Sequence, residues 1–283
     1  SEKIKAGTVI SCPARKAPDA WPNCWIYNRY RTGHDSLFAH SGGNCARNAL
    51  KGSCNIYFSQ LAEQIPPDIL QNWLLKFGYG KNPFKLPSTK EDNMHREIRQ
   101  LPGIVYSGRK NRPNRERIPP IRKNERRWFG IGQGNFRITP LQAANAMAAL
   151  ARGGLFQRPR LIIEEKQKVP KTYSLNISQE TVSTVRDGLY AVVNEQGGTA
   201  YKAFKNTGFP DIEITVFGKT GSTQKPANAW FAGFTEDSHG SSIAISVLVE
   251  GGSHGSSDAA PLARDIIEYC LDHGYLKSSD TGS

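Results

Sequence analysis

The sequence has 283 residues, enough to bury a sizeable core in one large domain or two small ones. Apolar residues make up 38% and charged residues 22% of it, which is typical of globular proteins. No run of about 18 apolar residues occurs, which excludes a membrane-spanning helix within these residues. The sequence starts at Ser1 without a methionine, so we expect it to be a piece of a longer protein.

The formal charge of +12 is concentrated in one segment. Residues 96–127 contain eleven Lys or Arg and only three Glu. Their prolines and weak apolar periodicity indicate a solvated loop inserted at the surface. A contact with an anionic polymer or a membrane surface is the alternative interpretation. We expect no nucleic-acid partner, because no recognition motif accompanies the charge.

The first half of the chain begins with loops and continues with a helix. The first 45 residues are rich in loops, with three prolines between Cys12 and Cys24. Apolar residues then recur at three- and four-residue spacing, which predicts a helix over 46–65 that Pro66 and Pro67 end.

Two further helices are predicted after the basic segment. Thr139, Pro140 and Gln142 have the pattern of a capping box that starts a helix, which Gly153 and Gly154 end. A second helix is predicted over 179–193, ending near the two glycines at 197–198.

The last third of the chain predicts strands and a final helix. Residues 212–216 alternate apolar and polar, and residues 228–235 and 241–250 form a predicted hairpin. The final helix is amphipathic, and we expect Leu262, Ile266, Tyr269 and Cys270 to share one face. Helices followed by three adjacent antiparallel strands and a closing helix predict an α+β fold, an antiparallel sheet covered by helices.

Two short motifs carry candidate chemistry. Ser53-Cys54-Asn55 lies at or near a helix beginning, and Lys219-Thr220-Gly221 lies at the end of a predicted strand. Each motif alone has an ordinary structural interpretation: Ser53 as a helix cap, and Lys219 as an edge-strand lysine that discourages aggregation. Together they match two of the three motifs that mark penicillin-binding proteins and serine β-lactamases.

The resemblance extends over nearly the whole chain outside the basic segment. The stretches "ALKGSCNIYFSQLAEQI", "GIGQGNFRITPLQAANAMAALARGG", "GGTAYKAF", "VFGKTGST", "AWFAGF" and "DAAPLARDII" resemble blocks of class B penicillin-binding proteins, in the family's order. The resemblance implies a β-lactamase/transpeptidase-like fold lacking its N-terminal part. Residues 1–276 would form this partial transpeptidase domain, with 96–127 as the basic insertion and 277–283 as a polar tail.

The family's reaction is acyl transfer, and the resemblance assigns roles to three side chains. A serine attacks the carbonyl of a D-Ala-D-Ala stem peptide, releases D-alanine and passes the acyl group to an amine. Ser53 would relay a proton to the leaving amine, and Asn55 would hydrogen-bond the substrate backbone and the active-site lysine. Lys219 would hold the substrate carboxylate and favour ionised neighbours.

The same resemblance assigns the residues at the end of the strand. Thr220 and Ser222 would offer hydroxyls to the substrate carboxylate, and Thr223 would contribute to substrate binding. Gly221 would let the substrate backbone approach closely, and the Ser222 N–H would form half of an oxyanion hole.

The family's Ser-x-x-Lys nucleophile is the missing third motif. The spacing occurs at Ser107 and Lys110, in the basic segment, and at Ser222 and Lys225, in the predicted strand. Neither context is the helix that would bring serine and lysine together. We therefore expect the chain as given to be unable to form an acyl-enzyme.

The early cysteines have two interpretations. Cys12 and Cys24 could form a disulfide, as in proteins of oxidising compartments. Some elongation-type relatives instead carry a structural zinc site in this region, and the resemblance then implies the ligands Cys12, Cys24, His40 and Cys54, with His34 competing with His40. Catalysis itself would require no cofactor.

The resemblance also implies partners and a location. The partners would be peptidoglycan stem peptides, β-lactam antibiotics and other cell-wall synthesis proteins, with a membrane anchor in a missing N-terminal part. The location would be the extracytoplasmic (periplasmic) face of the bacterial inner membrane. The alternatives are a D,D-carboxypeptidase or β-lactam sensor on the same scaffold, and a non-catalytic cell-wall binding or scaffolding module.

Overall fold

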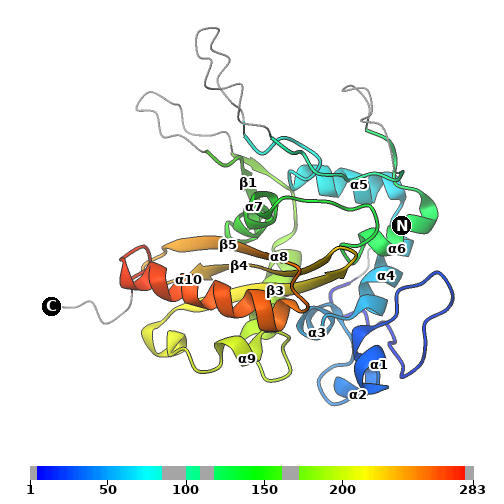
Figure 1. Ribbon diagram of the computed structural model, residues 1–283, viewed down its shortest axis with the longest axis horizontal. Coiled ribbons are helices and arrows are strands. Elements are labelled where there is room, and N and C mark those ends of the chain that lie inside the picture. Colours follow the sequence, from blue (N-terminus) through cyan, green and yellow to red (C-terminus); the bar gives the residue numbers. More distant parts are fainter. Residues whose placement is uncertain (1–4, 85–99, 109–117, 161–171, 278–283) are drawn as a thin grey trace, which may run out of the picture.

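The computed structural model describes residues 5–84, 100–108, 118–160 and 172–277. Its centre is an antiparallel sheet in the order β3-β4-β5 (Figure 1). The strands are β3 (Thr215–Gln224), β4 (Ala227–Glu236) and β5 (Ser242–Glu250). A separate two-stranded sheet pairs β1 (Leu155–Gln157) with β2 (Thr172–Ser174).

Helices cover both faces of the central sheet and one of its ends (Figure 1). The α-helices are α1 (Trp25–Tyr30), α2 (His34–Leu37), α3 (Ala46–Lys51), α4 (Asn55–Gln64), α5 (Pro67–Lys76), α6 (Arg126–Phe129), α7 (Pro140–Ala151), α8 (Gln179–Asn194), α9 (Tyr201–Phe204) and α10 (Ala260–Asp272). Short turns of other helix types are η2 (Lys123–Glu125), η3 (Phe209–Ile212) and η4 (Gly255–Ala259). Within the described ranges, no helix has the length and apolar character that crossing a bilayer requires.

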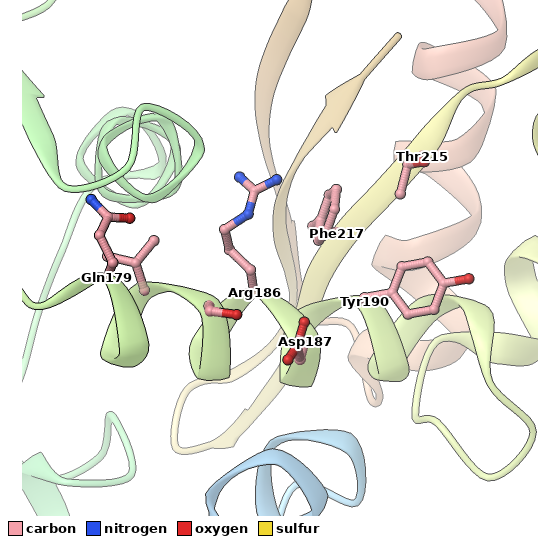
Figure 2. A pocket seen from close by; sticks show the side chains of 8 residues that line it. Gln179, Arg186, Asp187, Tyr190, Thr215 and Phe217 are labelled. Carbon is pink, nitrogen blue, oxygen red and sulfur yellow. The ribbon is translucent and has the colours of Figure 1, made fainter. Parts of the chain in front are cut away.

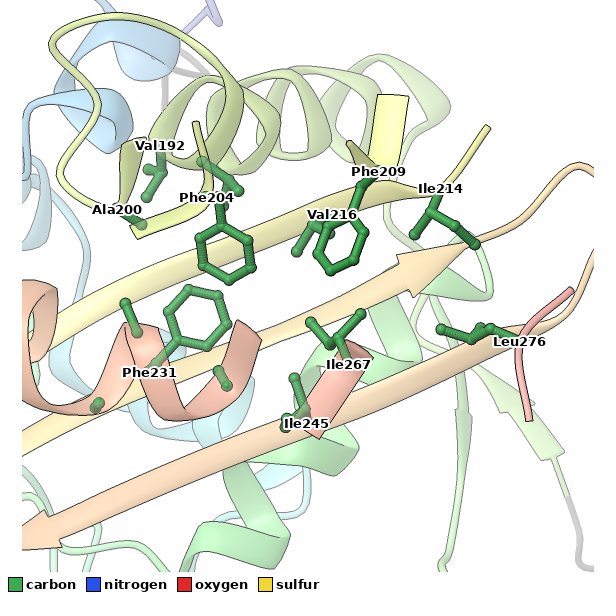
Figure 3. Close-up of a cluster of buried hydrophobic side chains, with 14 of the residues drawn as sticks. Val192, Ala200, Phe204, Phe209, Ile214, Val216, Phe231, Ile245, Ile267 and Leu276 are labelled. Carbon is green, nitrogen blue, oxygen red and sulfur yellow. The ribbon is translucent and has the colours of Figure 1, made fainter. Parts of the chain in front are cut away.

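The strand alternation divides the core into two layers. Val216 and Phe231 point to the face covered by α9 and α10, where the Phe204 and Phe231 ring centroids lie 5.7 Å apart (Figure 3). Phe217 and Phe234 point to the opposite face, where they stack at 4.6 Å beneath α7 and α8. Successive side chains of a strand alternate between faces, so both faces of this sheet are apolar and both need helices.

Several predicted elements are confirmed. Thr139 accepts a hydrogen bond from the Gln142 N–H, and the Gln142 side chain bonds back to the Thr139 N–H, completing the capping box of α7. The helix predicted over 179–193 is α8, and the predicted hairpin is β4-β5. The α+β class and the three adjacent antiparallel strands are therefore confirmed.

The single helix predicted over 46–65 is wrong, because the chain forms two helices. Helix α3 ends at Lys51 and α4 begins at Asn55. Between them Ser53 adopts a left-handed conformation, with φ of 53°. The Cys54 sulfur caps α4 by accepting a hydrogen bond from the Tyr57 N–H. The apolar periodicity of the sequence continues through this break, so the pattern could not predict where the helix is interrupted.

The face predicted for α10 is wrong for three of its four residues, whereas Cys270 does pack against the core. Leu262, Ile266 and Tyr269 are 46%, 45% and 56% exposed. The helix instead packs through a neighbouring stripe that includes Ala263 and Ile267. Small alanines allow α10 to lie close to the sheet, and this close packing selects the face.

The described part of the basic segment includes a short helix that packs on the rest of the fold. Residues 85–99 and 109–117, which carry much of its charge, lie outside the described residues. In the described part, Arg126 and Arg127 belong to α6 and both form ion pairs with Glu63 of α4. The predicted polar tail lies, from residue 278 onward, outside the described residues as well.

Two adjacent isoleucines test the orientation of α10. Ile267 is 1% exposed and Ile266 is 45% exposed. We expect Ile267→Ala to lower the free energy of unfolding by about 2–5 kcal/mol, because it leaves a cavity under the helix. The matched control Ile266→Ala should change it by about 0.5 kcal/mol or less. Chemical denaturation measures both, and equal losses would show that the helix is rotated from this position.

Candidate active site

The two sequence motifs meet in the folded chain. The Lys219 ammonium donates a hydrogen bond of 2.8 Å to the Ser53 hydroxyl, across 166 residues of sequence. It donates a second, also of 2.8 Å, to the carbonyl of Thr220. The site therefore lies where the turn between α3 and α4 faces the edge of β3.

The position of Lys219 changes its protonation. Burial favours the neutral amine and lowers the pKa of Lys219 to about 8, from an ordinary value of 10.5. Both hydrogen-bond partners of the ammonium are neutral oxygens, so neither offsets this loss of hydration with an opposite charge. The lysine can therefore exchange a proton near neutral pH, as an acid–base group must.

The turn that carries Ser53 is held from behind. The Gly52 carbonyl accepts hydrogen bonds from the Trp25 indole, at 2.8 Å, and from His34 Nε2, at 2.9 Å. A Cβ on Gly52 would lie 2.7 Å from the His34 ring, so only glycine fits here. A left-handed conformation is costly for serine, by about 1–3 kcal/mol, and these surrounding contacts hold it in place.

The outer edge of β3 presents backbone groups to the site. The carbonyls of Val216, Thr220 and Ser222 accept hydrogen bonds from side chains rather than from β4. In an antiparallel strand the N–H and C=O of one residue point the same way. The Ser222 N–H therefore points out of the sheet edge, the direction that the oxyanion-hole expectation requires.

The predicted hydroxyl groups already have partners. The hydroxyls of Thr220 and Thr199 lie 2.7 Å apart, and the Ser222 hydroxyl accepts a hydrogen bond of 3.1 Å from the Gly255 N–H. Thr223 donates to the Pro226 carbonyl at 2.6 Å. The Ser222 hydroxyl can still donate its own hydrogen, whereas the hydroxyl hydrogen of Thr223 is already donated to Pro226.

The Asn55 amide donates to the carbonyl of Asn23 at 3.0 Å. Its expected hydrogen bond to the active-site lysine stays a prediction. Asn55 is the first residue of α4, and its side chain ties this helix to the N-terminal loop. Its position beside Ser53 follows from the sequence, but its hydrogen-bond partner does not.

Three contributors to the site were missed by the motif reasoning. Thr199 bonds to Thr220, and Gln133 donates to the Ser222 carbonyl at 3.0 Å. Gly255 approaches so closely that a Cβ there would lie 2.4 Å from the Gly221 carbonyl oxygen. Thr199 and Gln133 both lie in stretches with family resemblance, which was the available signal.

The two Ser-x-x-Lys spacings differ in what the structure describes. Ser222 and Lys225 belong to the β3 end and its turn, where that spacing does not bring the two side chains together. Ser107 is buried and accepts a hydrogen bond from the Arg122 N–H, and Lys110 lies outside the described residues. Neither serine is placed as a nucleophile beside Lys219.

A second cluster lies directly behind Ser53. The sulfurs of Cys12, Cys24 and Cys54 and a ring nitrogen of His34 lie within 4.8 Å of one another, and all four residues are buried. The expected ligand His40 is wrong, because it is exposed and outside this cluster. Cys12 and Cys24 are free thiols, so the alternative disulfide is not formed.

The cluster has the surroundings of a metal centre. His34 Nε2 faces the Gly52 carbonyl, which can only accept, so this nitrogen carries the proton and Nδ1 keeps its lone pair. Nδ1 lies 3.2 Å from the Cys24 sulfur and 3.5 Å from that of Cys12. The Asn44 amide donates to the Cys54 sulfur at 3.3 Å. Three sulfurs and one imidazole suit a tetrahedral cation.

A pocket elsewhere on the surface is separate from this site. It lies between α8 and the beginning of β3, and Figure 2 shows Gln179, Arg186, Asp187, Tyr190, Thr215 and Phe217 around it. Its cation, Arg186, already forms an ion pair with Glu236, at 2.5 Å.

The titration of Lys219 tests the environment of the site. We expect the ammonium to lose its proton near pH 8, because burial penalises its charge. This lowered pKa makes folding less favourable once the lysine is protonated: the penalty is absent above about pH 10.5, grows as the pH falls and is complete below pH 8. Carbon-13 NMR of labelled lysines measures the titration, and Lys219→Met identifies the resonance. Titration near 10.5 would show a solvated ammonium.

Comparison with known proteins agrees with this geometry. Residues 18–268 match the penicillin binding protein transpeptidase domain family. The chain is 27% identical to the peptidoglycan D,D-transpeptidase MrdA of Haemophilus influenzae, over 88% of this chain and 40% of that protein. It is 28% identical to MrdA of Acinetobacter baumannii, over 85% of this chain and 35% of that protein.

A solved structure extends the likeness to the fold. A penicillin-binding protein (PBP2) from Helicobacter pylori matches with a TM-score of 0.72 and 26% identity, over 96% of this chain and 46% of that one. This chain thus spans less than half the length of these three relatives. With the family match over most of its length, and with the Ser-x-Asn and Lys-Thr-Gly motifs in contact, the chain belongs to the penicillin-binding-protein transpeptidase domain family.

Proposed function

We propose that this chain is part of a peptidoglycan D,D-transpeptidase and supplies the proton-relay and substrate-binding sides of its active site. One observation carries the proposal: the 2.8 Å hydrogen bond from Lys219 to Ser53, which brings two family motifs together. The named activity of the MrdA relatives supports the reaction class. The proposed partners are peptidoglycan stem peptides, β-lactams and other cell-wall synthesis proteins, at the extracytoplasmic face of the cell envelope.

The proposed chemistry uses Ser53 and Lys219 to move a proton. A serine outside these motifs attacks the D-Ala-D-Ala carbonyl, its oxygen bonds to the carbonyl carbon, and the bond to the terminal D-alanine nitrogen breaks. The Ser53 hydroxyl passes the proton from that serine to the departing amine. Lys219 orders the Ser53 hydroxyl by donating to its oxygen, which leaves the Ser53 hydrogen free to be passed on.

The proposed binding surface is the outer edge of β3. The Ser222 N–H stabilises the negative charge that develops on the carbonyl oxygen. The free hydrogen of the Ser222 hydroxyl and the charge of Lys219 attract the substrate carboxylate. Gly221 presents no side chain, so an extended peptide can lie against the edge of the strand. An amine from a second stem peptide then attacks the ester and releases the serine.

Covalent capture by a β-lactam tests this function. The protein from the full open reading frame, incubated with a fluorescent β-lactam, should gain one covalent adduct by intact mass. Lys219→Met should slow adduct formation by about 100-fold or more, because it removes the charge and the bond to Ser53. The exposed Lys202 provides the matched control, and Lys202→Met should react at the normal rate. A folded protein that forms no adduct would support the non-catalytic binding module instead.

We further propose that Cys12, Cys24, His34 and Cys54 hold a structural zinc ion. Hydrogen bonds from Cys12 and then Cys54 lower the pKa of Cys24, whereas burial raises the pKa of Cys54. Thiols this close cannot all ionise without a compensating charge, and a divalent cation supplies that charge. Because Cys54 follows Ser53 and His34 bonds to Gly52, the ion would stabilise the turn of the active site.

Variants at two histidines and two cysteines test the proposed zinc site. We expect about one zinc per chain by elemental analysis, and its loss in His34→Asn and in Cys24→Ser. The matched controls His40→Asn and Cys45→Ser lie outside the cluster and should keep the metal. Chelation should lower the melting temperature of the wild type and controls but not of the two metal-free variants. Full zinc content in His34→Asn would contradict this ligand set.

A further inference from the structure

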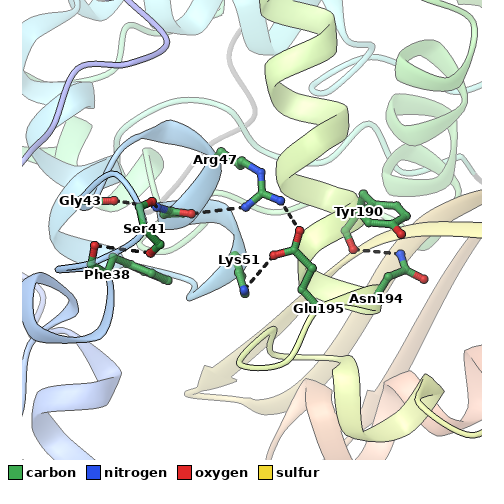
Figure 4. Close-up of polar contacts among 9 residues, drawn as sticks. Phe38, Ser41, Gly43, Arg47, Lys51, Tyr190, Asn194 and Glu195 are labelled. Atoms are coloured by element: carbon green, nitrogen blue, oxygen red, sulfur yellow. Dashed lines mark hydrogen bonds and ion pairs between the residues drawn. The ribbon is translucent and has the colours of Figure 1, made fainter.

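The C-terminal end of α8 carries two consecutive polar side chains, Asn194 and Glu195, and Figure 4 shows Glu195 bonded to Arg47 and Lys51 of α3. Glu195 accepts a hydrogen bond of 2.8 Å from Lys51 and another from Arg47, so it holds both ends of the short helix α3. Its neighbour Asn194 donates a hydrogen bond of 2.8 Å to the Val216 carbonyl on β3. One helix end is therefore bonded to the helix that precedes Ser53 and to the strand that carries Lys219.

The loop after α8 makes a second bridge between the same two elements. The Thr199 N–H donates to the Lys51 carbonyl at 3.3 Å, two residues before Ser53. The Thr199 hydroxyl lies 2.7 Å from that of Thr220, one residue after Lys219. Thr199 thus spans the short distance between the two motifs without lying in either of them.

The body of α3 also depends on α8. Leu50 packs against Gly188, where a Cβ would lie only 2.5 Å from the leucine side chain. Helix α3 has six residues, too few to be stable by its own hydrogen bonds. Its position, and with it that of the Ser53 turn, is therefore set by α8 and the loop that follows.

We propose that Glu195 and Thr199 are positioning residues that hold the Ser53 turn at bonding distance from Lys219. This inference rests on the proposed transpeptidase function for its effect on rate. Neither side chain needs to touch the substrate. The Glu195 carboxylate fixes α3 on α8 through two cations, and Thr199 links β3 at Thr220 to α3 at Lys51. Loss of either contact lets the Ser53 hydroxyl move away from the ammonium.

The kinetics of acylation test this role in the protein from the full open reading frame. For a β-lactam, stopped-flow measurement separates the dissociation constant of the first complex from the rate constant of acylation. We expect Thr199→Val and Glu195→Gln each to lower the rate constant by about 10- to 100-fold, since a displacement of about 1 Å has that effect. The dissociation constant should change much less.

Conservative and matched variants distinguish a positioning role from a general loss of structure. Thr199→Ser keeps the hydroxyl and should recover most of the wild-type rate. Asp187→Asn removes an exposed carboxylate from the same helix α8 and should react like the wild type. The double variant Glu195→Gln/Thr199→Val should be little slower than the slower single variant, because both contacts hold the same turn. Unchanged rates in both single variants, or a Thr199→Ser as slow as Thr199→Val, would overturn the proposal.

A second measurement does not depend on the reaction. Acetic anhydride labelling followed by peptide mass spectrometry reports how accessible Lys219 is, with the exposed Lys202 as internal reference. We expect Lys219 to be labelled faster in Thr199→Val and Glu195→Gln, and at the wild-type rate in Thr199→Ser. If the wild type forms no acyl-enzyme but labelling changes in this way, the proposed function fails and the positioning role stands. Unchanged labelling in both variants overturns the positioning role.

Discussion

The hydrogen bond between Lys219 and Ser53 is the contact on which this site depends. Its two ends belong to different parts of the fold, a turn between two short helices and the edge strand of a sheet. Strand β3, which carries Lys219, is held firmly, because its side chains alternate into two apolar layers and its pairing with β4 fixes the register. The turn that carries Ser53 is not paired with a strand, so its geometry must come from the side-chain contacts around it.

Those contacts come from three directions. The cysteine–histidine cluster holds the turn from behind through Gly52 and Cys54, and the loop at Asn23 binds the start of α4. Helix α8 holds α3 from the side through Glu195. A serine in a left-handed conformation persists when its surroundings over-determine it, and strain of this kind is common at functional sites.

The sequence predicted most of the sheet and its helices because their signals are local. The capping box of α7 and the hairpin between β4 and β5 each depend on neighbouring residues. The strand predicted from residue 212 begins only at Thr215, because Ile212 belongs to the turn η3. The break at Ser53 is different, since the helical periodicity continues through it. The buried face of α10 is different too, because close approach to the sheet favours Ala263 over the larger Leu262, which a hydrophobicity pattern ranks higher.

The cysteine–histidine cluster shows the same limit at the level of single residues. The family resemblance implied that Cys12, Cys24 and Cys54 come together, and their sulfurs do meet. The choice between His34 and His40 depends on which ring reaches the Gly52 carbonyl, a contact 18 residues apart in the sequence. Spacing alone does not contain that information.

The polar residues missed by the motifs share one property that explains their placement. Thr199, Gln133 and Glu195 each bond to a residue within two or three positions of Ser53 or Lys219, and none lies inside a motif. A motif marks groups that can meet the substrate, whereas these groups set where the motifs stand. Because the two motifs come from separate parts of the chain, their alignment requires contacts of this second kind, and α8 with its following loop is the element that touches both.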